Sequence, residues 1–225
     1  MTRRWWGVVP AVVTNNTDDT NLGRVKVKYT WAADDAESFW ARLAGPGAGN
    51  ERGLFWVPEV NDEVLVAFGH GNFNQPYVIG SLWSDTIPAP ESAAVVDGAV
   101  EIRTLKTRAG HIIRLTDTAG EEKIEIIDAT EDTKIVMNTA DKGITVYSAQ
   151  TISIDGAGST VDIHGGGDIS VDGDAAINVT AGGDLTLSGM NVTISADVAV
   201  KVSGGTAELS ASGTTDVKGS VVNIN

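Results

Sequence analysis

Residues 161–187 read VDIHGGGDISVDGDAAINVTAGGDLTL, and this stretch decides how the second half of the chain folds. Two apolar residues, one position apart, recur after a short run of small, turn-forming residues. The first members of successive pairs are 8, 9, 8, 8, 8, 7 and 8 residues apart between Ile144 and Val200. Such a period is typical of a repeat whose unit is one short strand and one bend. The predicted core pairs are Ile144/Val146, Ile152/Ile154, Val161/Ile163, Ile169/Val171, Ile177/Val179, Leu185/Leu187, Val192/Ile194 and Val200/Val202.

One such octad cannot bury its own two apolar side chains, so three octads must meet to enclose a core. They come either from one chain, as a β-solenoid with about 24 residues per coil, or from three chains, as an intertwined β-prism. Neighbouring octads look alike and show no longer period, which favours three chains in identical environments. Each octad then adds roughly 4.8 Å, and ten or so octads make a rod on the order of 50 Å long.

The first 85 or so residues have a different composition, because all six tryptophans lie at or before Trp83 and all six prolines at or before Pro90. Val25, Val27 and Tyr29 alternate with polar residues, which predicts a half-buried strand. About five strands separated by turn signals fit a small barrel of the OB or SH3 kind. Residues 32–43 are expected to form one short helix.

Charge and composition exclude several classes of protein. The formal charge is −14, from 16 basic and 30 acidic residues, and phosphate backbones repel such a chain. No cysteine is present, so disulfides and thiolate chemistry are ruled out. No apolar run approaches the roughly 18 residues that a membrane span needs. The apolar start, Trp5–Val13, is interpreted as a first strand and not as a signal peptide, since it is short and contains Pro10.

Several motifs stand in a characteristic order along the chain. They are Gly7–Val13, Leu22–Val27, Phe39–Leu43, Gly53–Phe68 and Gln75–Leu82, followed by Thr107–Thr118 and Glu122–Ile126. In these motifs the chain resembles the baseplate assembly protein V and VgrG family, the spikes of contractile injection machines. The resemblance implies an all-β protein, with an N-terminal OB-fold barrel and a C-terminal intertwined triple-stranded β-helix, or β-prism, formed by three chains.

The resemblance also implies a function and partners. The protein would be the homotrimeric central spike of a phage tail, bacteriocin, extracellular injection system or type VI-like machine, and it would puncture the target cell envelope mechanically. A baseplate hub protein would bind the OB end and a PAAR-type tip protein the C-terminal end, with no nucleic acid. The particle would assemble in the cytoplasm of the producing cell and act outside it. No enzymatic activity and no cofactor are implied.

The chain also departs from the family pattern. VgrG proteins carry a large hub region before the OB domain, whereas Met1 stands almost directly before it, so we expect the hub on a separate chain or missing here. Residues 88–110 are too few for the lysozyme domain of some phage spikes. Residues 221–225 hold no histidine-rich tip. We expect either a separate tip protein that covers the last β edge or a truncated native end.

The remaining candidate sites have simple structural interpretations. The three histidines, His70, His111 and His164, are too far apart in sequence to suggest a ligand set, and no metal is predicted. The glycine-aspartate runs at 165–168 and 182–184 resemble calcium-binding nonapeptides, but the period of eight favours turns. No catalytic motif is present, and no catalytic or cofactor-binding residue is predicted.

The basic stripe Arg24, Lys26 and Lys28 offers weak support for single-strand binding on an OB barrel. The predicted domains are therefore an OB domain at 1–86, a linker or neck at 87–110 and the octad-repeat needle at 111–225. Two alternatives to the spike remain. One is an OB-fold ligand-binding module on a β-solenoid stalk, and the other is a secreted enzyme or calcium-dependent solenoid formed by a single chain.

Overall fold

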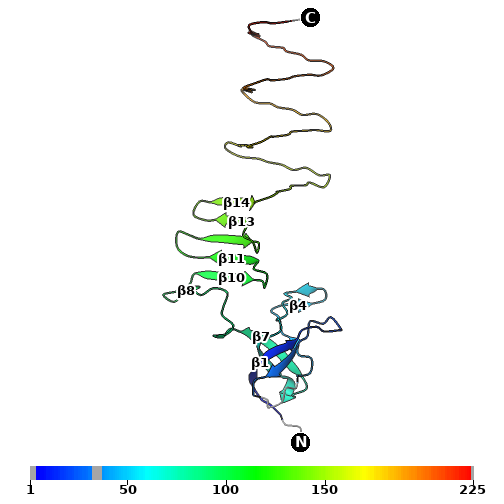
Figure 1. The fold of residues 1–225 in the computed structure, drawn as a ribbon, viewed down its shortest axis with the longest axis vertical. Helices are drawn as coiled ribbons and strands as arrows, with labels where there is room; N and C mark the ends of the chain where they lie inside the picture. The colour runs from blue at the N-terminus through cyan, green and yellow to red at the C-terminus, as the bar shows by residue number, and fades with distance from the viewer. Residues whose placement is uncertain (1–3, 32–36, 224–225) are drawn as a thin grey trace. The chain divides into compact units, whose positions relative to one another are not determined.

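A computed structural model describes residues 4–31 and 37–223, and its regular structure is β-strand, without an α-helix in those residues (Figure 1). The chain divides into two compact units, Met1–Asp155 and Gly156–Asn225. The first unit contains a barrel sheet followed by an antiparallel meander. In the described part of the chain, no helix is long and apolar enough to cross a membrane.

The barrel sheet has the strand order β2-β1-β6-β7-β3. Its strands are β1 (Val8–Asn15), β2 (Lys26–Tyr29), β3 (Arg42–Leu43), β6 (Glu63–Phe68) and β7 (Pro76–Leu82). Strand β1 lies second in this order and pairs antiparallel with both β2 and β6. Alternate residues of these strands fill the core, as the period of two predicts. The buried residues are Ala11, Val13, Val25, Val27, Tyr29, Ala41, Val64, Val66, Phe68 and Val78.

Aromatic side chains close one side of the barrel core. The Tyr29 ring lies 5.0 Å from Phe73 and 5.7 Å from both Trp31 and Phe68, measured between ring centroids. Trp5 packs on Trp31 at 4.4 Å. Rings at these separations add packing energy to the area they bury. This cluster explains why the aromatic residues concentrate in the first region of the sequence.

The short helix expected at 32–43 is wrong for the residues that the structure describes there. Residues 32–36 lie outside the described residues. After them, the Ser38 N–H donates to the Val27 carbonyl, and Ala41 exchanges two backbone hydrogen bonds with Val25. The chain is therefore extended along the edge of β2, where it buries Ala41 in the core. Tertiary pairing has overridden a weak helical pattern.

The meander consists of five strands that pair in sequence order, all antiparallel. They are β10 (Ile102–Lys106), β11 (Ile112–Thr116), β12 (Lys123–Ile127), β13 (Thr133–Asn138) and β14 (Gly143–Ser148). Strand β10 lies inside the range 87–110 that was expected as a linker, as does a hairpin of β8 (Val95–Val96) and β9 (Ala99–Val100). Asp97 and Gly98 both have positive φ, the geometry of a type I′ hairpin turn. A second small hairpin is formed by β4 (Ala48–Gly49) and β5 (Arg52–Gly53).

The second unit contains extended segments joined by bends, and no strand pairing is present between residues 156 and 223 (Figure 1). The bends recur at octad spacing and separate the apolar pairs. They lie at 157–159, 166–167, 174–175, 182–183, 190, 197–198, 205, 212–213 and 220–221. Each octad therefore has one extended segment and one bend, as the sequence predicts.

Candidate assembly interface

One face of the meander is built almost entirely from apolar side chains. Strand alternation and register place two columns of facing residues on it. The first column is Leu105, Ile113, Ile126, Ile135 and Val146, and the second is Arg103, Leu115, Ile124, Met137 and Ile144. We call the nine apolar members of these columns the apolar face.

The apolar face is the more exposed side of the sheet, and the buried residues of β11 and β12 lie on the opposite, more polar side. Ile124 and Ile126 are 40% and 46% exposed, whereas Glu125 between them is 8% exposed. Ile112 and Thr116 of β11 are likewise buried on that opposite side. A sheet normally buries its apolar side, so this inverted burial indicates a face made for another surface.

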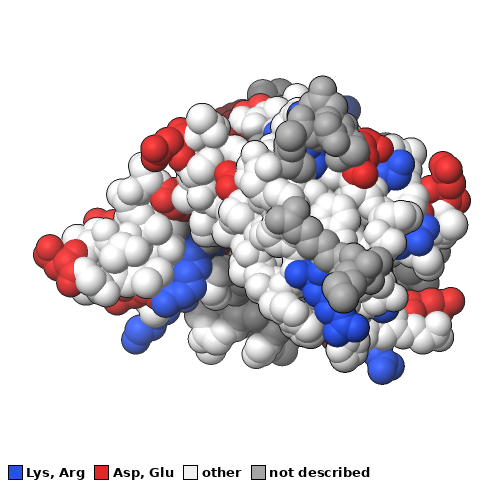
Figure 2. All heavy atoms as spheres, turned by 90° about the horizontal axis from the view of Figure 1, so that it is seen from below, with Lys and Arg blue, Asp and Glu red and all other residues white. Residues whose placement is uncertain are grey.

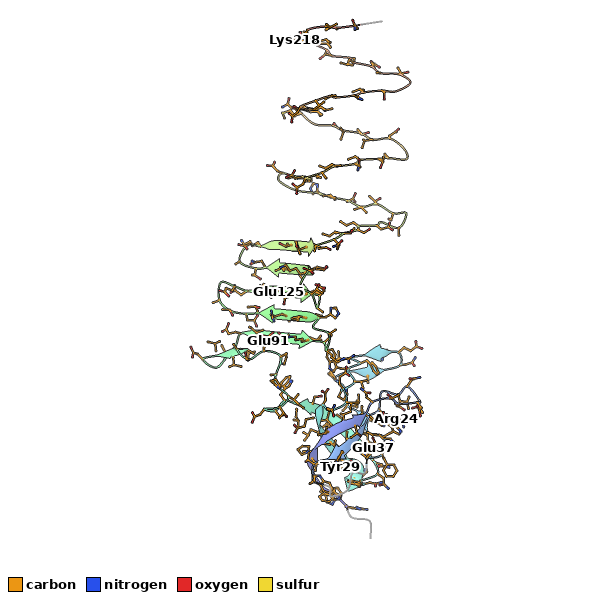
Figure 3. The ribbon with its side chains drawn as sticks, viewed as in Figure 1. Arg24, Tyr29, Glu37, Glu91, Glu125 and Lys218 are labelled. Carbon is orange, nitrogen blue, oxygen red and sulfur yellow. The ribbon has the colours of Figure 1, made fainter. Side chains whose placement is uncertain are left out.

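Long polar side chains and the segment before β8 cover the opposite side. The Glu91 carboxylate accepts hydrogen bonds from the Thr104 hydroxyl at 2.7 Å and from Arg114 at 2.7 and 3.0 Å. Figure 3 labels Glu91 beside the meander and Glu125 on it. The Thr104 hydroxyl and the Arg114 charge together lower the pKa of Glu91. Lys123 pairs with Glu125, and the Lys134 ammonium lies over the Tyr147 ring.

The apolar pairs of the octads are exposed, like the residues of the apolar face. From Ile152 to Val202, the first members of the pairs are 49–57% exposed and the second members 66–81%. The lower value of the first members has a local cause. A Cβ placed on Gly165 or Gly173 would lie 3.2 or 3.1 Å from Ile169 or Ile177, so each of these isoleucines folds back over the glycine before the bend.

None of the sixteen predicted core residues is buried within the single chain. Ile144 and Val146 lie in β14 and face Met137 and Ile135 of β13, but their outer sides are open. The other fourteen lie outside any strand and are all exposed: Ile152, Ile154, Val161, Ile163, Ile169, Val171, Ile177, Val179, Leu185, Leu187, Val192, Ile194, Val200 and Val202.

The physical reason is that successive extended segments share no backbone hydrogen bond between residues 160 and 223, so one octad does not form a sheet with the next. Within one copy of the chain these pairs therefore form no core. Their burial stays a prediction about an assembly.

Sequence reasoning missed the seven apolar-face residues that precede β14. Their period of two, as in Ile124-Glu125-Ile126, was the signal that could have identified them. The candidate interface is therefore longer than the octad repeat and begins at β10.

Burial of these surfaces would be strongly favourable. Full burial of one aliphatic side chain stabilises a structure by about 1.5–3 kcal/mol. The nine residues of the apolar face are 38–72% exposed, so their coverage is worth several kcal/mol per chain. Extended segments without backbone partners also need hydrogen bonds once they leave water. A partner that buries these surfaces would have to supply both apolar surface and strand edges.

The basic stripe of the barrel is already engaged within the chain. Arg24 binds the Asp18 carboxylate at 2.8 Å and lies over the Trp40 ring, and Lys26 binds Glu37 at 3.0 Å (Figure 3). The Arg24 guanidinium holds the pKa of Asp18 well below its usual range. In Figure 2, basic side chains form small groups separated by uncharged and acidic atoms. These features give no support to a groove for single-stranded nucleic acid.

The three histidines have separate surroundings. His70 occupies a left-handed turn position in the 3₁₀ turn Gly69–Gly71, next to a hollow lined by Trp5 and Trp31. His111 accepts a hydrogen bond on Nδ1 from the Ala129 N–H, and His164 is exposed. Among residues 4–31 and 37–223, no three histidine or acidic side chains gather as a metal-ligand set.

Comparison with known proteins finds a family model that matches the barrel. Residues 9–83 match the family described as the type VI secretion system/phage-baseplate injector OB domain. The chain is 32% identical over 119 residues to the type VI secretion system spike protein VgrG3 of Vibrio cholerae, covering 50% of this chain and 12% of that protein. It is 33% identical over 109 residues to spike protein VgrG4b of Pseudomonas aeruginosa, covering 45% and 14%.

A further relative carries a different name. The actin cross-linking toxin VgrG1 of Vibrio cholerae is 28% identical over 109 residues, which is 45% of this chain and 10% of the toxin. The chain therefore spans only about a tenth to a seventh of the length of these three relatives.

Proposed function

Since residues 9–83 form an OB domain of the type VI secretion system and phage-baseplate injector family, we propose that three copies of this chain assemble into the central spike of a contractile injection machine. The OB domains would form the base, and the meanders and octads would intertwine into a three-sided needle. The spike would puncture the target envelope mechanically and have no catalytic role of its own. The similarity to VgrG spike proteins supports this assignment.

The observation that carries the proposal is the inverted burial of the meander together with the unpaired octads. A needle of three copies explains both features at once. Three apolar faces would turn toward a common axis, which buries them against each other. A chain that advances one face per octad returns to its first face after about 24 residues. The strands of the two other copies would then fill the two levels between, about 4.8 Å apart.

The two alternatives do not account for these features as well. A one-chain β-solenoid pairs each coil with the next by backbone hydrogen bonds, yet residues 160–223 carry none between coils. A ligand-binding OB module leaves the exposed apolar face and the unpaired octads unexplained, and the charges of Arg24 and Lys26 are neutralised within the chain. The spike therefore explains more of the molecule.

The partners follow from the same proposal. A hub protein would seat the OB end, and a PAAR-type tip protein would cover the open strand edges at the C-terminal end of the needle. The particle would assemble in the cytoplasm of the producing cell, and the spike would act at the target envelope.

Absolute mass in solution tests the proposal directly. Light scattering or native mass spectrometry should give about 70 kDa, three times the 23.4 kDa of one chain. The octads should also add strongly to the far-ultraviolet β signal, because they pair only in the assembly. A stable species of 23.4 kDa at micromolar concentration would overturn the assignment and favour the single-chain solenoid.

A further inference from the structure

Two polar borders flank the apolar columns, one at each end of the strands. Continued alternation places polar residues on the apolar side at each border. The histidine border consists of Thr107, His111, Asp128, Thr133 and Ser148, one residue for each strand from β10 to β14. The acidic border consists of Glu101, Asp117, Glu122 and Thr139 in the same order, with Lys142 in the left-handed turn just before β14.

His111 is held with its donor free to bind another group. Its Nδ1 accepts a hydrogen bond of 3.2 Å from the Ala129 N–H, which places the proton of the neutral ring on Nε2. The His111 N–H is fixed in turn by the Thr107 hydroxyl at 3.1 Å. The ring is exposed. Its Nε2–H is therefore available to a carboxylate outside this chain.

The surface beside His111 is hollowed. A hollow of about 370 Å³ lies at this end of the strands, lined by His111, Leu105, Ile113, Ile126, Ile135 and Asp128 among others. It combines apolar walls from the first column with a polar rim. A second protein surface, with an apolar body and an acidic edge, matches it in chemistry.

The path of the chain indicates which neighbour lies at the histidine border. Strand β14 runs from the acidic border at Lys142 to the histidine border at Ser148. A bend at 149–150 follows, and then the first apolar pair outside the meander, Ile152/Ile154. If Ile152 and Ile154 lie beside β14 of the neighbouring copy, the histidine border of the first copy adjoins the acidic border of that neighbour. Each strand of the first copy then points to the following strand of the neighbour, so that β11 points to β12.

We propose that the histidine border of each copy seats against the acidic border of the next copy with a shift of one strand, so that His111 donates to Glu122 of the neighbouring copy. This inference rests on the proposed trimer and specifies how its subunits are arranged. The partner is a second copy of this chain. The contact joins two different surfaces of the chain, so three copies close into a ring.

The charges favour this register over the two adjacent ones. With a shift of one strand, Asp128 faces Thr139 and Thr133 faces Lys142, so no like charges meet. Without a shift, Asp128 faces Glu122, and with the reverse shift it faces Asp117. Both place two carboxylates together, and like-charge contacts at an interface are costly. Chain path and charge therefore indicate the same arrangement by independent arguments.

Engineered disulfides test the arrangement, because the native chain has no cysteine. In the double variant His111→Cys/Glu122→Cys, the two thiols of one chain lie at opposite borders, about 20 Å apart, beyond the reach of a disulfide. Mild oxidation should therefore give a covalent trimer on a non-reducing gel. The matched control, His111→Cys/Asp117→Cys, reports the unshifted register and should cross-link at least tenfold more slowly.

Each other outcome overturns the inference in a recognisable way. Faster linkage of the Asp117 pair would show an unshifted register, and covalent dimers of single His111→Cys would show contact between like borders. A mass of three chains with no cross-link in either double variant would reject the border contact while the spike assignment stands. If oxidation conditions impair the fold, subunit exchange gives a second readout. His111→Glu should speed exchange about tenfold, and addition of Glu122→Gln should reverse part of this effect.

Discussion

At the scale of single residues, Asp18 organises the loop between β1 and β2. Its carboxylate accepts hydrogen bonds from the Thr20 hydroxyl, from the N–H groups of Thr20 and Leu22, and from the Arg24 side chain. The side chain is nearly inaccessible to solvent. These bonds favour the ionised form, and the Arg24 contact is the main reason that the pKa of Asp18 is strongly lowered. One carboxylate thus satisfies a turn that has no regular secondary structure.

The lowered pKa gives a pH-dependent prediction. Asp18→Asn should lower the melting temperature of the barrel by several degrees at pH 7, because the charge-assisted bonds are lost. A lowered folded-state pKa contributes stability above the ordinary value of 3.8, and that stability is lost as the pH falls below it. The difference between the variant and the native chain should therefore shrink below about pH 4.

Tryptophan fluorescence is suited to this measurement, since all six tryptophans lie in residues 1–83. Asp19→Asn is a matched control that removes an adjacent, exposed carboxylate. A constant difference between Asp18→Asn and the native chain from pH 7 to pH 2 would contradict the role given to Asp18.

At the scale of elements, Glu91 anchors the segment before β8 on the covered side of the meander. Its loss leaves Arg114 without the carboxylate it binds, which costs about 1–3 kcal/mol. We expect Glu91→Ala to release residues 86–100, with faster amide hydrogen exchange and faster proteolysis there. Glu121→Ala, which removes an exposed acid from the same unit, should leave this segment protected. Unchanged protection in Glu91→Ala would show that other contacts hold the segment.

The octads give a sharper test of the inward direction of the apolar pairs. Ile177→Asp should abolish the needle, because the assembly would bury three unpaired charges near its axis. Asn178→Asp adds the same charge one position along, on the opposite side of the segment, and should assemble normally. Native mass spectrometry compares the two. A heat-resistant trimer of Ile177→Asp would show that the pair points outward.

Elements were predictable from sequence where a repeated pattern specified them. The octad spacing predicted the bends, and the alternation of Val25, Val27 and Tyr29 predicted the buried side of β2. The turn at Asp97-Gly98 carried a type I′ signal between two short valine-rich strands, but proline residues nearby suggested a linker. The Glu91 contacts join residues 13 and 23 positions apart, and no periodicity reports such a pairing.

The assembly face was only partly predictable, for a physical reason. Alternation identifies which residues share a face, but it does not say which side of a sheet its own chain covers. In the meander the covered side contains Arg114, which is paired with Glu91, a partner 23 positions away in sequence. The octad pairs were recognisable because each repeats its neighbour. In the proposed assembly the surface that completes them belongs to other copies, so the sequence of one chain has no separate pattern that reports it.

At the scale of the whole molecule, charge should oppose assembly. Residues 143–200 contain seven aspartates and neither lysine nor arginine, and each copy carries a formal charge of −14. Three copies bring these charges within a few Debye lengths of each other, and the Debye length is about 10 Å at 0.1 M salt. We expect the melting temperature of the assembly to rise with sodium chloride from about 20 to 500 mM.

Neutralisation provides the control for this effect. Asp162→Asn/Asp172→Asn should raise the melting temperature at low salt and reduce the slope with salt, because both aspartates lie within the acidic stretch. Differential scanning calorimetry at several salt concentrations measures both quantities. A melting temperature independent of salt would contradict the expected repulsion. It would show that bound counterions already neutralise the aspartates or that tilted strands hold them apart.

The regular bends of the second unit also have a consequence for how such a protein changes over generations. Insertion of one whole octad moves every later segment to the next face in all three copies at once, so the threefold arrangement is restored after each insertion. The rod would lengthen by about 4.8 Å for each octad gained. Insertion of a single residue would instead turn every later apolar pair away from the axis. In the proposed spike the repeat would therefore set the length of the needle, and its reach across envelopes of different thickness would change in fixed increments while the barrel at its base stays unchanged.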